Sequence, residues 1–269
     1  MSLSIILLYA TTGIVAGFLA GLFGVGGGLI IVPALLYCFY LQGFDPSISM
    51  HIAIGTSLAT IILTSISSAR AHHAHGAVQW LIVKRMTLGI VIGGVLGALI
   101  AKSLRSDSLQ LIFAVFEILV AIKLFRNAKV KADKSFSESR LLNTWPLIGA
   151  SILISAVSAI VGIGGGSLSV PFLRLTGISI QKAIATSAAL GFPIAIAGSL
   201  AFMWTGSGNA LLPEYSIGFI YLPALVGVGF LSIFLAPLGA RCAHRLPAEI
   251  LQTIFAAGLL IVAMVLLIK

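Results

Sequence analysis

Two glycine-rich stretches of the chain have the composition of an anion-binding backbone. GVGGGLIIVP (Gly24–Pro33) is repeated as GIGGGSLSVP (Gly162–Pro171), and apolar residues flank both copies. Each glycine destabilises a helix by roughly 1 kcal/mol relative to alanine, so we expect a helix to end at each run. A second helix should then begin at about Leu29 and about Ser167. Its free N–H groups and dipole would favour an anion, and we predict that both stretches lie on the path of an anionic substrate.

Small hydroxyl groups are the other donors that the sequence offers to an anion. Lys and Arg are nearly absent from the apolar runs, while the pair Thr56–Ser57 is matched by Thr186–Ser187. Small polar residues also serve helix packing in membranes, so both roles stay open for these pairs. The predicted substrate-binding residues are Gly24, Gly26, Gly27, Gly28, Pro33, Thr56, Ser57, Gly162, Gly164, Gly165, Gly166, Ser167, Pro171, Thr186 and Ser187.

Other chemistries fit the residues less well. No GK[ST] follows either glycine run, and neither run lies in a βαβ context, so a phosphate loop and a dinucleotide site are excluded. No nucleophile with a base occurs, and we expect neither an enzyme nor a cofactor. His72, His73 and His75 have no Asp, Glu or Cys nearby. We therefore expect no metal site there, because a basic cytoplasmic loop accounts for the cluster.

Glu117 is the exceptional charge of the apolar runs. It lies in the middle of a run at about 107–126, and its matched position in the second half is Leu259. An intramembrane carboxylate is a candidate proton carrier by default. The alternatives are a pair with a nearby polar group and a packing role in a dimer.

The elements that position these residues must be membrane helices. The chain of 269 residues is 59% hydrophobic and 9% charged, against about 25% charged residues in soluble domains. Apolar runs repeatedly reach the length of about 18 residues that crosses a bilayer, and they do not alternate as barrel strands do. The expected runs lie at about 4–42, 48–70, 82–102, 107–126, 144–176, 181–204, 215–240 and 248–268.

Three matched blocks indicate two homologous halves. Besides the glycine stretches, AIGTSLA (Ala53–Ala59) is matched by AIATSAA (Ala183–Ala189), and LRSDSLQLIF (Leu104–Phe113) by LPAEILQTIF (Leu246–Phe255). The expected domains are a first membrane repeat at 1–126, a cytoplasmic linker at 127–143 and a second membrane repeat at 144–269. Each repeat would contain a glycine-broken first element followed by three transmembrane helices.

The basic residues indicate how the first element of each half crosses the membrane. If it spans, ten of the sixteen Lys and Arg residues lie inside. If it breaks at its glycines and returns to the same side, only Lys102, Arg105 and Lys269 lie outside and thirteen lie inside. The positive-inside rule favours the second arrangement, in which the repeats have inverted topology. The same rule assigns the net charge of +9 to cytoplasmic loops rather than to a nucleic-acid partner.

The motifs together resemble a known family. The GxGGGxxxVP motif in each half, the paired A-T-S stretches and HHAHGAVQW (His72–Trp80) are similar to the TauE/SafE family, also called the toluene-sulfonate uptake permeases. The resemblance covers essentially the whole chain. It implies a bacterial or archaeal plasma-membrane permease for small sulfur-containing anions such as sulfite, sulfoacetate, related sulfonates or thiosulfate. Some members are proposed exporters and others importers, and export is the direction expected here from the resemblance alone.

The sequence therefore predicts an all-α polytopic transporter of a small anion in the bacterial inner membrane. Its expected mechanism is alternating access, in which one half rocks against the other around a midplane site at the glycine breaks. The alternatives are an anion channel and a transporter of another substrate, such as a metal cation. The partners considered are the anionic substrate, the lipid bilayer, a proton as coupling ion and a second copy of the chain in a homodimer.

Overall fold

The computed structural model describes residues 2–127, 144–243, 257, 260 and 264, and this part of the chain is almost entirely helical. Five of its helices are long and apolar enough to cross a membrane, which confirms the prediction of an all-α multi-pass membrane protein. The elements are α1 (Leu3–Phe23), α2 (Gly28–Leu41), α3 (Pro46–Ala74), α4 (Trp80–Ser103), α5 (Ser106–Asn127), α6 (Thr144–Val161), α7 (Gly166–Leu175), α8 (Ile180–Gly206), β1 (Ser216–Ile217), β2 (Ile220–Tyr221) and α9 (Leu222–Ala243).

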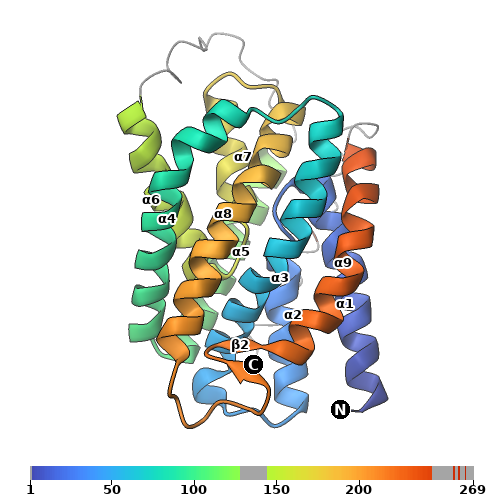
Figure 1. Ribbon diagram of the computed structural model, residues 1–269, viewed down its shortest axis with the longest axis vertical. Helices are drawn as coiled ribbons and strands as arrows, with labels where there is room; N and C mark the ends of the chain where they lie inside the picture. Colours follow the sequence, from blue (N-terminus) through green and yellow to red (C-terminus); the bar gives the residue numbers. More distant parts are fainter. Residues whose placement is uncertain (1, 128–143, 244–256, 258–259, 261–263, 265–269) are drawn as a thin grey trace.

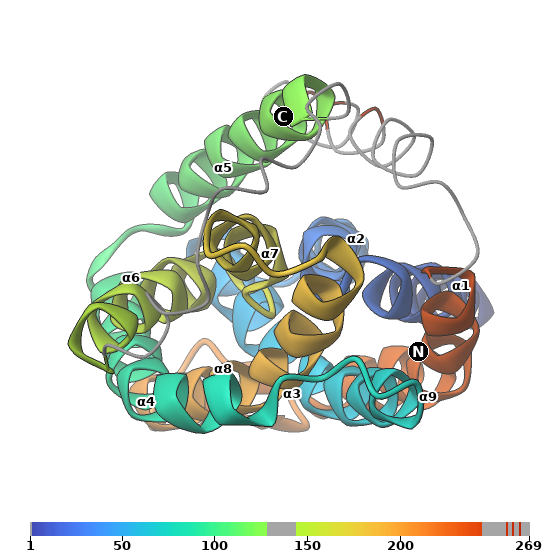
Figure 2. The same cartoon turned by 90° about the horizontal axis from the view of Figure 1, so that it is seen from above.

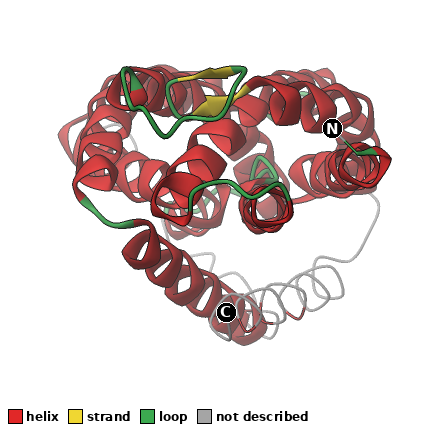
Figure 3. Cartoon of the chain, turned by 90° about the horizontal axis from the view of Figure 1, so that it is seen from below, coloured by secondary structure: helices red, strands yellow, loops and turns green. Residues whose placement is uncertain are grey.

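Most element boundaries lie close to the predicted runs, with one difference in kind. Both long runs, 4–42 and 144–176, divide at their glycines as expected, into α1 and α2 and into α6 and α7. The run predicted at 215–240 begins instead with the hairpin β1–β2, because Tyr215 and Gly218 have positive φ angles that turn the chain. Figure 3 shows this hairpin lying across one end of the helices. The run predicted at 248–268 lies outside the described residues, apart from three isolated positions.

The helices form two facing rows. Seen from above, α4, α8, α3 and α9 make one row and α6, α7, α2 and α1 make the other, with α5 on the far side of the second row (Figure 2). α2 and α7, which follow the glycine breaks, lie in the centre of their row. The glycine breaks are therefore surrounded by protein, as non-helical backbone at membrane depth must be.

The two ends of the molecule can be defined by their loops. The lower end carries residues 42–45, residues 104–105 and the hairpin, and the upper end carries residues 75–79 and 176–179 (Figure 1). α1 runs upward from the lower end and α2 returns to it, so that the Gln42 side chain, just beyond α2, donates to the Tyr9 hydroxyl at 2.8 Å. α6 runs downward from the upper end and α7 returns to that end (Figure 1).

Charge is distributed unequally between these ends. Among the described side chains, Lys102 and Arg105 are the basic residues of the lower end, which also carries three of the four described carboxylates. No described carboxylate lies at the upper end. The basic residues there are Arg70, Lys84, Arg85, Arg174, Lys182 and Arg241.

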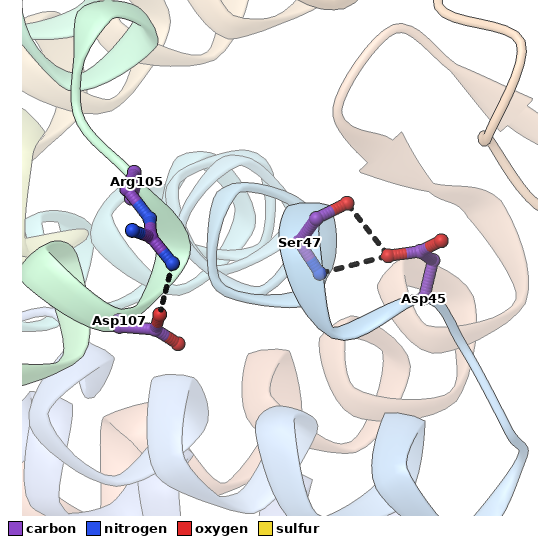
Figure 4. A network of polar contacts seen from close by, with 4 residues as sticks. All are labelled: Asp45, Ser47, Arg105 and Asp107. Carbon is purple, nitrogen blue, oxygen red and sulfur yellow. Dashed lines mark hydrogen bonds and ion pairs between the residues drawn. The ribbon is translucent and has the colours of Figure 1, made fainter.

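Polar contacts occur at the lower end where α3 and α5 begin. The Asp45 carboxylate accepts hydrogen bonds from the Ser47 hydroxyl at 2.6 Å and the Ser47 N–H at 2.8 Å, which caps α3 (Figure 4). These two bonds hold the pKa of the Asp45 carboxyl below its usual value. Arg105 and Asp107 form an exposed ion pair at 3.3 Å where α5 begins (Figure 4).

Glycine stripes join helices from different halves of the chain. Gly13, Gly17 and Gly21 of α1 lie against α9, and a Cβ added at Gly17 would stand 2.6 Å from the Cα of Ser232. Gly89, Gly93 and Gly97 of α4 face α6 in the same way, and a Cβ at Gly93 would stand 2.9 Å from the Cα of Ile152. Small residues permit this close approach of backbones in membranes. The first helix of each half therefore packs against the fourth helix of the other.

Candidate functional site

The two glycine breaks share a left-handed backbone conformation at their first and last glycines. The C-cap of α1 is Gly24 with φ 66°, and the N-cap of α2 is Gly27 with φ 84°. The second break has Gly162 with φ 78° and the N-cap Gly165 with φ 76°. Side chains disfavour this left-handed region, so glycine is required at these four positions and at Gly26, where φ is 78°. The helices that follow begin at Gly28 and Gly166, one residue before the expected starts.

The two breaks meet directly in the interior. A Cβ added at Gly26 would stand 3.1 Å from the Cα of Gly164, and one added at Gly28 would stand 2.8 Å from the Cα of Ile163. A Cβ at Gly166 would overlap the backbone of Gly24 and Val25. All residues from Gly24 to Gly28 and from Gly162 to Gly166 are buried. The N-termini of α2 and α7 therefore lie side by side, while the two helices run to opposite ends of the molecule.

The paired serines connect the breaks crosswise. The Ser57 hydroxyl of α3 donates to the Gly162 carbonyl at 2.8 Å, and the Ser187 hydroxyl of α8 donates to the Gly24 carbonyl at 3.1 Å. Each serine thus reaches the break of the opposite half. Both side chains are completely buried.

The paired threonines hold the starts of two later helices. The Thr56 hydroxyl accepts the N–H of Tyr221, which precedes α9, at 2.9 Å. The Thr186 hydroxyl accepts the N–H of Gln79, the residue before α4, at 3.0 Å. These bonds also cross between the halves. The hydroxyls of both Thr-Ser pairs are therefore engaged with the backbone in this conformation.

Unpaired donors remain around the breaks. The N–H groups of residues 26–29 and 164–167 have no backbone acceptor among the described residues. At the second break the hydroxyls of Ser167 and Ser169 are buried without a hydrogen-bond partner in the described part of the chain. The first break carries Leu29 and Ile31 at the matching positions. The second break is therefore the more polar of the two.

Pro33 and Pro171 lie inside α2 and α7. A proline lacks the N–H that would bond the carbonyl four residues earlier, so the carbonyls of Leu29 and Ser167 lose their helical donors. These prolines shape the first turns of both helices and contribute no donor to an anion.

Two sets of buried serines were not among the predicted site residues. Ser169 is completely buried beside the break, although it stands in the repeated stretch itself. Ser151, Ser155 and Ser158 line one buried face of α6, where Ser155 donates to the Ile90 carbonyl of α4 at 2.7 Å. Their spacing of four and three residues in an apolar helix was the signal that could have found them.

Glu117 lies on the inner face of α5. The side chain is completely buried, and neither carboxylate oxygen has a hydrogen-bond partner among the described residues. An ionised carboxylate without a partner is very costly in such a place. The alternative of a paired carboxylate finds no partner in the described residues.

Three of the histidines each form a hydrogen bond with a different partner. His72 is buried in α3 and donates to the Gly21 carbonyl of α1 at 2.9 Å, while His73 accepts from the Trp80 ring N–H at 3.1 Å. His51 is buried and donates to the Ala101 carbonyl at 3.1 Å. No group of three or more His, Cys, Asp or Glu side chains that could hold a metal ion occurs in the described part of the chain.

Comparison with known proteins places these features in a family context. The model of the family described as "Sulfite exporter TauE/SafE" matches residues 9–266. A "Probable membrane transporter protein" of Haemophilus influenzae is 40% identical over 98% of both chains. The "Probable membrane transporter protein YunE" of Bacillus subtilis is 31% identical over 74% of this chain and 78% of its own. The "Probable membrane transporter protein MJ0441" of Methanocaldococcus jannaschii is 26% identical, over 89% and 87%. No solved structure matches the chain.

Proposed function

Because the chain belongs to the sulfite exporter TauE/SafE family, we propose that it exports a small anion, a sulfur oxyanion or an organosulfonate such as sulfite or sulfoacetate. The observation that carries this proposal is the direct contact of the two glycine breaks. Two helix N-termini meet there, with free N–H groups and the unpaired hydroxyls of Ser167 and Ser169. Such a place can bind an anion without a buried cation.

The proposed binding residues are those predicted from the two stretches, with Ser169 added. The N–H groups around Gly26–Leu29 and Gly164–Ser167 would contact the anion. The Thr-Ser pairs would not contact the anion themselves but would position the backbone that does, since their hydroxyls bond the breaks and the starts of two helices. A sulfonate or sulfite oxygen accepts several such hydrogen bonds at once, and bonds to charged groups are the stronger ones.

We further propose that the repeats are inverted in the inner membrane of a bacterial cell. The paths of α1–α2 and α6–α7, which enter from opposite ends, support this (Figure 1). The concentration of basic residues at the upper end supports a cytoplasmic position for that end. The linker at 127–143 lies mostly outside the described residues. It joins the C-terminal end of α5 to the N-terminal end of α6, and both of these helix ends lie at the upper end of the molecule (Figure 1).

The proposed alternating access requires two bodies that move, and the packing suggests which they are. α1 is packed through glycines on α9 and α4 on α6, so the sequence halves cannot separate without breaking these contacts. We infer that α1, α2, α3 and α9 form one body and α4, α6, α7 and α8 the other. Each body contains one glycine break, and their motion would open the substrate site to one end at a time.

Glu117 is proposed as the proton-coupling residue. It would be neutral where it is buried, and it would release its proton when the motion exposes it to water. Glu117→Gln keeps the shape and the neutral form but cannot titrate. We expect this variant to retain substrate counterflow while transport driven by a pH gradient is lost. Unchanged gradient-driven transport in the variant would exclude the role.

Transport by purified protein in proteoliposomes tests the proposed function. The panel comprises sulfite, sulfate, thiosulfate, sulfoacetate, taurine, nitrate and a divalent metal ion. We expect saturable flux and counterflow with a sulfur-containing anion. Flux without saturation or counterflow would indicate a channel, and flux of the metal ion alone would contradict the anion proposal.

Variants of the second break test the site itself. Ser167→Ala combined with Ser169→Ala should reduce transport efficiency about 10- to 100-fold, the effect of losing hydrogen bonds to a charged group. The control is Ser151→Ala, because that hydroxyl bonds within its own helix. Gly165→Ala should abolish transport. Gly43→Ala is its control and should retain transport, because Gly43 has a comparable positive φ but open space around it. Full activity in both break variants would exclude the site.

A further inference from the structure

A groove separate from the glycine breaks lies between the upper halves of α3 and α9. It has a volume of about 630 Å³, and its lining includes the apolar residues Leu63, Ile66, Ile233 and Pro237 and the basic residues Arg70 and Arg241. The apolar residues lie deeper along both helices and the arginines lie toward the upper end. The groove is therefore amphipathic along its length.

The spacing of the lining residues gives the groove its shape. Leu63, Ile66 and Arg70 share one face of α3, and Arg70 stands about 10 Å above Leu63 at 1.5 Å per residue. Ile233, Pro237 and Arg241 follow one another at four-residue intervals along α9. Each helix thus presents a row of apolar residues with an arginine at its upper end, and the two rows have similar lengths.

The floor of the groove is fixed by one hydrogen bond. Pro237 lacks the N–H that would bond the Ile233 carbonyl, and the Ser67 hydroxyl of α3 donates to that carbonyl at 2.6 Å. This bond joins the two helices beneath the arginines. The shape of the groove is consequently determined by the packing between α3 and α9.

The surroundings favour a membrane lipid as the occupant. Phe230, Phe234 and Leu238 continue beside the groove as an exposed apolar stripe on α9. Arg70 and Arg241 are exposed and form no ion pair with a carboxylate in the described part of the chain. No described carboxylate lies at that end of the molecule. A small soluble anion would need the arginines but not the apolar rows below them.

We propose that this groove binds one anionic phospholipid. The phosphate lies between Arg70 and Arg241, and an acyl chain follows the apolar rows toward Leu63 and Ile233. Basic pockets between transmembrane helices bind acidic headgroups in this way. The groove spans about one third of the hydrocarbon thickness of about 30 Å, so the upper part of an acyl chain fits it. The site bridges α3 and α9, and it does not depend on which anion is transported.

Native mass spectrometry of the full chain in detergent tests the lipid site. Phosphatidylglycerol and phosphatidylcholine with identical acyl chains are added together at equal concentration. We expect retention of phosphatidylglycerol over phosphatidylcholine by roughly fivefold per arginine. Equal retention of the two lipids by the unmodified chain would overturn the proposal.

Variants distinguish the groove from general attraction to a basic surface. Arg70→Gln combined with Arg241→Gln should bring the preference close to one. Lys84→Gln combined with Lys182→Gln removes the same charge from the same end outside the groove, and the preference should remain. Ala71→Leu fills the groove without changing charge and should weaken binding of both lipids. A preference that survives in the arginine variant, or displacement of the lipid by millimolar sulfite, would overturn the proposal.

Discussion

Ser57 and Ser187 each donate a hydrogen bond to the glycine break of the opposite half, and this makes the breaks depend on each other. Both acceptors are carbonyls at positions where the helix has ended, so no helical N–H is available to them. A buried carbonyl without a donor is costly. The serines therefore supply hydrogen bonds to two carbonyls that would otherwise be buried without a donor.

We expect Ser57→Ala and Ser187→Ala each to destabilise the protein by about 1–3 kcal/mol, the cost of a buried unsatisfied carbonyl. The measurement is thermal or denaturant unfolding in detergent. Ser199→Ala is the control, since that buried hydroxyl bonds a carbonyl of its own helix at 3.2 Å. An equal loss of stability in all three variants would contradict the crosswise role.

The sequence predicted the location of the breaks better than the function of single hydroxyls. The doubled glycine motif was sufficient because five of its glycines have positive φ, which few other residues tolerate. The partners of Ser57 and Ser187 were not predictable, because they lie 105 and 163 residues away. Whether any of these residues binds substrate stays a prediction.

At the scale of elements, two glycine stripes determine which helices pack together. The stripe Gly13, Gly17, Gly21 meets α9 and the stripe Gly89, Gly93, Gly97 meets α6. A stripe of small residues in a sequence indicates that some helix approaches closely. It does not indicate which helix. The pairing of the first and fourth helices across the halves therefore emerged only from the structure.

We expect Gly93→Val to separate α4 from α6 and destabilise the protein by at least about 1–3 kcal/mol, the usual cost of overpacking. The added carbons would meet the backbone of Ile152, which cannot move aside as a flexible side chain can. Gly149→Val is the matched control, because nothing lies within 4 Å of a Cβ at that position of α6. The melting temperature and monodispersity of both variants are compared. Similar behaviour would contradict the packing.

At the scale of the whole molecule, the described basic residues are concentrated at one end. The six described basic residues of the upper end face no described carboxylate there, while the lower end is mixed. The spans could be predicted from the sequence because apolar length alone defines them. The hairpin before α9 could not, since its residues are as apolar as those of the helix that follows.

Cysteine labelling in intact cells measures this orientation. In a chain with Cys242→Ser, Ser2→Cys should react with an impermeant maleimide from outside, because Ser2 is exposed at the lower end. Ala74→Cys, exposed at the upper end, should react only after permeabilisation. Cys38 is buried and serves as an internal background. The reverse pattern would contradict the orientation.

The packing of α1 against α9 has a consequence for biosynthesis. α9 is translated roughly 200 residues after α1, which takes about 10–40 s at 5–20 residues per second. During that interval the glycine face of α1 has no protein partner and must wait in lipid or beside the insertion machinery. α4 waits far less, since α6 follows it after the linker. The α4–α6 pair can therefore form while α9 has not yet been made, and the α1–α9 pair can form only later.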